Sequence, residues 1–167
     1  MEIKYFNSNF DKITQNKDTD QSITNVIEKL PSLNIVSDKN LLEETIKISN
    51  QFKEKKEKII VFGTGGSNLG ARALNNIISN NKIILEFYDN VDPINFEKNF
   101  QNINFELTGF LVISKSGTTP ETLSQFSCLY QKAIEANKVE DFFSNTLIIT
   151  EFKESPLFKI AKDNNCL

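Results

Sequence analysis

Four short, mostly apolar runs, each followed by a turn or a cluster of small and polar residues, are the strongest constraint on how this chain can fold. They are Ile59–Phe62, Ile83–Phe87, Phe110–Ile113 and Leu147–Ile149. Runs without polar alternation are typical of strands buried on both faces of a parallel sheet. Helical patterns lie between or after them, at Gly70–Ile78, Asn95–Phe100, Pro120–Ala136 and Pro156–Lys162. This alternation predicts an α/β fold of three layers, with a parallel, flavodoxin-like sheet between two layers of helices.

The first third of the chain has a different, helical pattern. Apolar residues at helical spacing mark one segment, which Pro31 should end: Ile23, Val26, Ile27 and Leu30. A second amphipathic helix carries Leu41, Leu42, Ile46, Ile48 and Phe52, and we expect these side chains to pack into a core. The sequence therefore predicts a helical N-terminal extension, residues 1–55, followed by an α/β domain, residues 56–167.

Charge and composition exclude several classes of function. The formal net charge is −3 and Arg72 is the single arginine, which argues against nucleic acid as a partner. No stretch resembles a signal peptide or approaches the ~18 apolar residues needed to span a bilayer, so we expect no membrane partner and a cytoplasmic protein. The two cysteines, Cys128 and Cys166, have no metal-binding or redox spacing.

The chain contains no histidine. This absence removes the usual general base, the usual zinc ligand and every Ser-His or Cys-His nucleophile. We therefore expect no metal site and no cofactor. Any chemistry must use carboxylates, hydroxyls, lysine or backbone amides.

The first loop with a chemical signature follows the first predicted strand and reads Gly63-Thr-Gly-Gly-Ser-Asn-Leu-Gly70. It is not a dinucleotide fingerprint, because the sixth position of that motif is Asn68 rather than glycine, although Asp89 could imitate the ribose-binding acid. It is not a Walker A loop either. The glycines could serve only a tight turn, but four in eight positions favour close approach of backbone amides to a ligand.

The second such loop follows the third predicted strand and reads Ser114-Lys-Ser-Gly-Thr-Thr-Pro-Glu-Thr122. Four hydroxyl residues stand in six positions directly before a predicted helix, with Thr119 suited to the cap and Pro120 to the first helical position. The free amides and the positive end of the helix dipole attract anions. Because capping alone leaves Ser114, Ser116 and Thr118 without a role, the loop predicts a phosphate site.

These residues carry a resemblance to a known family. Ser114-x-Ser-Gly-x-Thr-x-Glu121 resembles the phosphate loop of SIS (sugar isomerase) domains. The Gly65–Gly70 run and the Asn90-Val-Asp-Pro93 segment are similar to motifs of the phosphoglucose isomerase (glucose-6-phosphate isomerase) family within that superfamily. The similarity covers roughly residues 55 to 165, so the chain resembles the N-terminal SIS domain of that family.

The resemblance implies a hexose phosphate as ligand and assigns roles to individual residues. Phosphate contacts fall to the loop residues Ser114, Lys115, Ser116, Gly117, Thr118 and Thr119, assisted by Thr122. Sugar contacts fall to Gly65, Gly66 and Ser67. Glu121 becomes an auxiliary catalytic residue near the ring-opened substrate, although a carboxylate there could equally serve only the helix dipole.

The resemblance also implies what is missing. In the family, the glutamate base, a Gly-Gly-Arg motif and the ring-opening histidine lie in later sequence, and the full protein is a homodimer. We therefore expect isomerisation of glucose 6-phosphate to fructose 6-phosphate, in glycolysis and gluconeogenesis, from the full-length enzyme, and binding alone from this chain. Cys166-Leu167 resembles the start of a further strand, so the domain is expected to be cut before its last strand. The alternative is a stand-alone SIS module that senses sugar phosphates without catalysis.

Overall fold

The computed structural model describes residues 17–78, 82–151 and 153–167. Its contacts divide the chain into two units, one reaching Ile46 and one comprising Lys47–Leu167. The first contains helices α1 (Lys17–Lys29) and α2 (Pro31–Asn34), the short 3₁₀ helix η2 (Ile35–Ser37) and most of α3 (Lys39–Phe52). Pro31 therefore opens a second short helix after α1 has ended.

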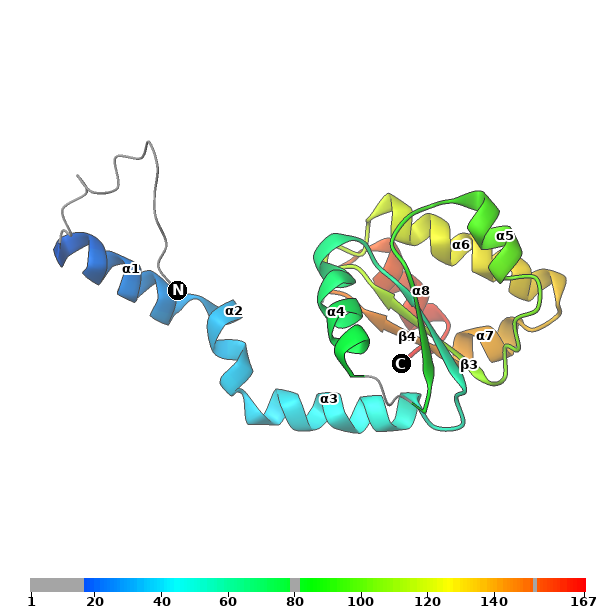
Figure 1. Cartoon of the computed structure of the whole chain (residues 1–167), viewed down its shortest axis with the longest axis horizontal. Helices are drawn as coiled ribbons and strands as arrows, with labels where there is room; N and C mark the ends of the chain where they lie inside the picture. The colour runs from blue at the N-terminus through cyan, green and yellow to red at the C-terminus, as the bar shows by residue number, and fades with distance from the viewer. Residues whose placement is uncertain (1–16, 79–81, 152) are drawn as a thin grey trace. The chain divides into compact units, whose positions relative to one another are not determined.

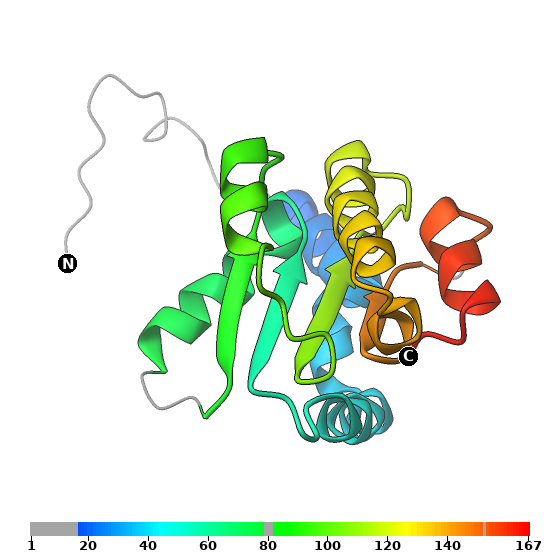
Figure 2. The same cartoon turned by 90° about the vertical axis from the view of Figure 1, so that its right-hand side faces the viewer.

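The second unit contains a parallel sheet of four strands, as predicted. The strands are β1 (Lys58–Phe62), β2 (Ile84–Tyr88), β3 (Thr108–Ile113) and β4 (Thr146–Ile149). Their order across the sheet is β2-β1-β3-β4, and Figure 2 shows β2, β1 and β3 side by side. The central pair is in register with Ile60 opposite Phe110. Because the chain passes from β1 outward to β2 and then back to β3, the direction of winding reverses between β1 and β3, where such sheets bind ligands.

Helices cover both faces of this sheet (Figure 1). The first connection contains the 3₁₀ turn η3 (Gly65–Ser67) and α4 (Leu69–Ile77). The opposite face carries α5 (Pro93–Asn99), α6 (Pro120–Glu135), α7 (Val139–Ser144) and α8 (Pro156–Asp163). The three-layer α/β architecture expected from the sequence is confirmed.

The two faces of the sheet have cores of different size. On the side of α5 to α8, a large aromatic cluster centres on Phe62, Phe110 and Phe142, which have no exposed surface. On the other side the buried core is small and consists of Phe52, Ile59 and Val61. Gly109 makes room there, because a Cβ at this position would lie 2.9 Å from the Phe52 ring.

The apolar faces of the N-terminal helices differ from expectation. Of the α3 residues predicted to be core, Phe52 alone is buried, whereas Leu41, Leu42, Ile46 and Ile48 are 41–57% exposed. Ile23, Val26 and Ile27 of α1 are exposed as well, and so is Leu30 directly after it. Helical periodicity correctly predicted amphipathic helices, but periodicity reports only that an apolar face exists and not which element covers it.

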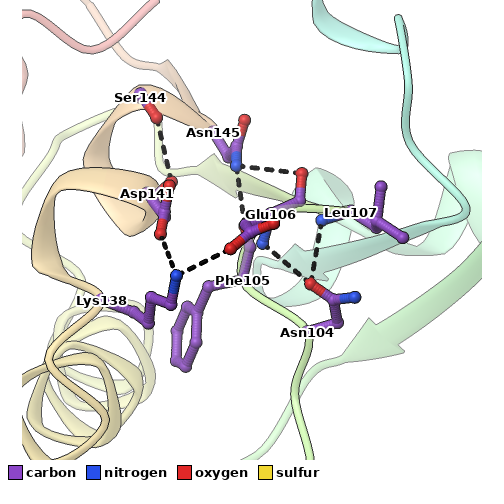
Figure 3. A network of polar contacts seen from close by, with 8 residues as sticks. All are labelled: Asn104, Phe105, Glu106, Leu107, Lys138, Asp141, Ser144 and Asn145. Carbon is purple, nitrogen blue, oxygen red and sulfur yellow. Dashed lines mark hydrogen bonds and ion pairs between the residues drawn. The ribbon is translucent and has the colours of Figure 1, made fainter.

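A polar network fixes the end of the sheet where β3 and β4 begin (Figure 3). The Asn145 amide donates to the carbonyl of Phe105 at 2.7 Å, just before β4. The Asn104 side chain accepts from the amides of Glu106 and Leu107 at 3.1 and 3.3 Å. Lys138 at the start of α7 forms an ion pair with Glu106 at 2.7 Å. These contacts lie at the amino ends of the strands, so the chemistry predicted for the carboxyl ends is physically separate from them.

Candidate functional site

The carboxyl ends of β1, β3 and β4 open into a cleft of about 460 Å³. The described residues of its lining come from three connections and are Thr64, Ser67, Lys115, Ser116, Thr119, Glu151 and Lys153. Both loops with a chemical signature in the sequence therefore meet at one site. These described residues are polar and carry two ammonium groups, one carboxylate and four hydroxyls, which suits a small hydroxylated anion.

The loop after β1 is a tight turn that closes on itself. Gly65 has φ +53°, a conformation that glycine adopts without steric cost, and it begins η3. The fully buried Asn68 donates from Nδ2 to the carbonyl of Gly63 at 3.1 Å, which joins the two ends of the turn. The asparagine that breaks the dinucleotide fingerprint is thus a structural residue. Asp89 is also engaged, because it forms an ion pair with Arg72 of α4 at 3.1 Å.

The loop after β3 is organised around the hydroxyl of Ser114, which is 2% exposed. This oxygen accepts from the Gly117 amide at 3.1 Å and lies 2.8 Å from the Thr119 hydroxyl oxygen. At the rim, Ser116 Oγ accepts from the amide and the hydroxyl of Thr118. The loop therefore holds its shape through its own side chains.

Gly117 fits the loop against the start of α8. Its φ is +66°, and a Cβ there would lie 2.1 Å from Ser155 Oγ. The Gly117 carbonyl accepts from the amide of Leu157 at 3.2 Å. Ser155 in turn caps α8 by accepting from the Phe158 amide at 3.2 Å. Because the Gly117 carbonyl bonds to α8 and any side chain at this position would meet Ser155, the glycine serves packing as well as loop conformation.

Helix α6 begins at this loop as predicted, with Thr119 in the capping position and Pro120 as the first helical residue. The Thr119 hydroxyl makes no capping hydrogen bond and is directed to Ser114 instead. The first turn of α6 thus adds the positive end of its dipole to the site without a side-chain cap. Glu121 lies exposed in that first turn.

The predicted site residues divide into two groups by position. Lys115, Ser116, Thr119 and Ser67 line the cleft. The others belong to the same two segments but are not among the described residues of its lining: Gly65, Gly66, Ser114, Gly117, Thr118, Glu121 and Thr122. Thr122 is fully buried, and its hydroxyl has no hydrogen-bond partner among the described residues.

Two charged residues of the lining, Glu151 and Lys153, were not predicted from the sequence. They follow β4, and Glu151 accepts a hydrogen bond from Lys153 and forms an ion pair with Lys115 at 3.7 Å. The hydrogen bond from Lys153, with the positive charges of Lys153 and Lys115, holds the pKa of Glu151 below its ordinary value. The rule that ligands bind beyond the carboxyl ends of parallel strands, applied also to β4, would have found this segment.

The Asn90-Val-Asp-Pro93 segment is structural. Asp92 caps α5 by accepting from the amide of Ile94 at 3.0 Å. The segment is held from α6 by Gln125, which is fully buried and donates to the carbonyls of Tyr88 and Asn90 at 3.2 and 2.8 Å. One side chain therefore joins α6, which starts at the loop after β3, to the exit of β2.

The described residues form a parallel α/β domain whose polar cleft lies between loops at the carboxyl ends of its strands. Domains with this arrangement form a class of α/β domains that bind small ligands at the carboxyl ends of their strands. Among the described residues, no helix has both the length and the apolar character needed to cross a bilayer.

Comparison with known proteins identifies the family. The family model described as phosphoglucose isomerase matches residues 13–164, and the chain belongs to this family. It is 35% identical over 125 residues to a glucose-6-phosphate isomerase of Prochlorococcus marinus, covering 72% of this chain and 23% of that protein. A probable glucose-6-phosphate isomerase of Methanococcus maripaludis is 37% identical, with 70% and 27% covered. The chain thus spans about a quarter of the length of these relatives.

Solved structures agree with the assignment. The crystal structure of a glucose-6-phosphate isomerase from Chlamydia trachomatis superposes with a TM-score of 0.60 at 25% identity, covering 69% of this chain and 23% of that one. A hypothetical protein from Thermus thermophilus superposes with a TM-score of 0.66 at 27% identity, covering 74% and 30%. The chain is therefore a domain related to glucose-6-phosphate isomerase.

Proposed function

We propose that this chain binds a hexose phosphate in the cleft, as the phosphate-binding SIS domain of a glucose-6-phosphate isomerase. The observation that carries the proposal is the loop after β3, whose Ser116 and Thr119 line a cleft at the first turn of α6. Hydroxyls, backbone amides and the helix dipole together favour a phosphate group at such a position. Lys115 adds a positive charge at the rim.

The sugar would extend from this loop toward the turn after β1. Ser67 lines the cleft, and a Cβ added at Gly66 would meet no atom within 4 Å, so a ligand can approach that backbone closely. Ser114 would order the loop through its buried hydroxyl, and its direct contact with phosphate, like those of Gly117, Thr118 and Thr122, remains a prediction.

We further propose that the chain binds substrate without converting it. Proton transfer between C2 and C1 needs a base over the carbon and cationic stabilisation of the oxyanion. The chain has no histidine, and its single arginine, Arg72, is paired with Asp89 outside the cleft lining. Glu121 would assist by positioning the substrate. Isomerisation, the glycolytic and cytoplasmic setting and a homodimer are proposed for the full-length enzyme.

The second candidate function is a sugar-phosphate sensor without catalysis, favoured by the same lack of a general base. The two candidates differ in what the gene encodes after Leu167. A continuation that contains a Gly-Gly-Arg segment supports the isomerase, and a stop codon supports the sensor.

Titration of the ¹⁵N-labelled chain with glucose 6-phosphate tests the binding site. The amides of Gly117 and Thr119 should shift first and saturate together. If they stay in place at millimolar ligand while other amides move, the proposed site is wrong. A coupled assay from fructose 6-phosphate should read background, and activity that Glu121→Gln abolishes would instead make Glu121 the base.

A further inference from the structure

The segment after β4 forms a third wall of the cleft that the phosphate-loop motif does not include. It is joined to the loop after β3 by the main chain, because the Glu151 amide donates to the carbonyl of Lys115 at 3.0 Å. Ser114, the residue before Lys115, donates from its amide to the carbonyl of Ile149 at 3.1 Å. The two connections therefore keep a fixed relation, and any anion held by the loop lies close to the charges of this wall.

The three charges of the wall and loop differ in how firmly they are held. Glu151 has a tethered backbone and a side chain 32% exposed, whereas the side chains of Lys115 and Lys153 are 86% and 73% exposed. Exposed ion pairs hold long lysine side chains only weakly. The carboxylate thus extends from a tethered main chain, whereas the two ammonium groups are on exposed side chains and can exchange it for another anion.

We propose that Glu151 is a resident counter-ion of the phosphate site, which a bound phosphate group displaces from Lys115 and Lys153, and that Lys153 is a further phosphate-contacting residue. This inference rests on the proposed function, because it assigns two more residues to the same phosphate site. A negative charge near the bound phosphate lowers affinity, because it repels the phosphate and competes with it for the two ammonium groups. Glu151 therefore limits how tightly phosphate monoesters bind, which permits release as well as capture.

The chain supplies matched controls for both residues. Glu154 and Lys159 lie three and six positions further along and pair with each other at 4.0 Å. Both are exposed, and neither lines the cleft. Glu154→Gln and Lys159→Gln therefore change the net charge as Glu151→Gln and Lys153→Gln do, without changing the charge at the site.

The test is titration of the ¹⁵N-labelled chain and these four variants with inorganic phosphate at constant pH and ionic strength, followed at the Gly117 amide. Glu151→Gln should lower the dissociation constant about three- to tenfold, from the loss of one like charge at a few ångströms in a solvated site. Lys153→Gln should raise it by a similar factor. Both control variants should stay within about twofold of the parent chain.

Three results would overturn the inference in distinguishable ways. The first is an equal dissociation constant for Glu151→Gln and Glu154→Gln, with a saturable shift of the Gly117 amide in the parent chain. This result would reject the counter-ion role and leave the proposed function standing. Weaker binding by Glu151→Gln would show that the carboxylate instead positions the lysines. No saturable shift of Gly117 in the parent chain would reject the proposed phosphate site and this inference with it.

Discussion

Replacing Gly117 by alanine is expected to destabilise the domain through two separate effects. The residue has φ +66°, where an added Cβ crowds the following carbonyl oxygen. The same Cβ would lie 2.1 Å from Ser155 Oγ, 2.7 Å from Ser155 Cβ and 2.9 Å from Thr150 Oγ1. Distances this short require the start of α8 to move away from the loop.

The two effects can be given separate magnitudes. The left-handed conformation costs roughly 1–2 kcal/mol for a residue with a Cβ. Forcing extra atoms into a packed site typically costs about 1–3 kcal/mol. The free energy of unfolding of Gly117→Ala should therefore fall by about 2–5 kcal/mol, a large part of the ~5–15 kcal/mol typical of a folded domain. Urea denaturation followed by circular dichroism measures the change.

A double-mutant cycle separates the steric effect from the backbone effect. Ser155→Gly removes the two closest atoms, and replacing a capping serine by glycine costs only a few tenths of a kcal/mol. The double variant Gly117→Ala/Ser155→Gly should have a free energy of unfolding about 1–3 kcal/mol higher than Gly117→Ala alone, because only the backbone cost remains. Gly70→Ala in α4 is the control, because its Cβ would meet nothing within 4 Å. It should raise the free energy of unfolding by roughly 0.5–1 kcal/mol, since alanine favours a helix over glycine. The steric explanation would be refuted if the free energy of unfolding fell by less than about 1 kcal/mol in Gly117→Ala, or if the double variant were no more stable than Gly117→Ala.

Two further outcomes are expected. Gln125→Met keeps the volume but leaves the carbonyls of Tyr88 and Asn90 without their donor, so urea denaturation should show a loss of about 1–3 kcal/mol; an unchanged midpoint would show that water replaces the amide. A thiol reagent at pH 8 should modify the exposed Cys128 well before Cys166, because burial raises the pKa of Cys166 to about 11. Equal rates, measured by mass spectrometry, would contradict the burial of Cys166.

Most of the sheet could be predicted from the sequence because its strands are buried on both faces. The apolar runs mark the four strands to within one or two residues, and Pro120 marks the start of α6. Helix α7 was not predicted, since its six residues, Val139–Ser144, are too few to show a helical period. The partner of the apolar face on α1 and α3 could not be predicted, because periodicity carries no information about distant contacts.

The candidate site could be predicted in part. Its two loops are unusually rich in glycine and hydroxyl residues, and this composition can be recognised in the sequence alone. Glu151 and Lys153 carry no such signal, because alternating charges after a strand look like an ordinary solvated turn. The hydrogen bond between the buried Ser114 hydroxyl and Thr119 could not be predicted either, because Thr119 is equally suited to capping the helix.

In the proposed function, the two ends of the sheet have different roles, one in stability and the other in binding. At the amino ends, the amide and ammonium groups of Asn145 and Lys138 are directed to neighbouring protein atoms (Figure 3). At the carboxyl ends, the buried hydroxyl of Ser114 bonds within its loop, while Ser116 and Thr119 line the cleft. A loop that is ordered by its own side chains before a ligand arrives loses less conformational entropy on binding. In the proposed function, such a loop would hold a phosphate with few contacts, and the charge of Glu151 would keep that binding reversible.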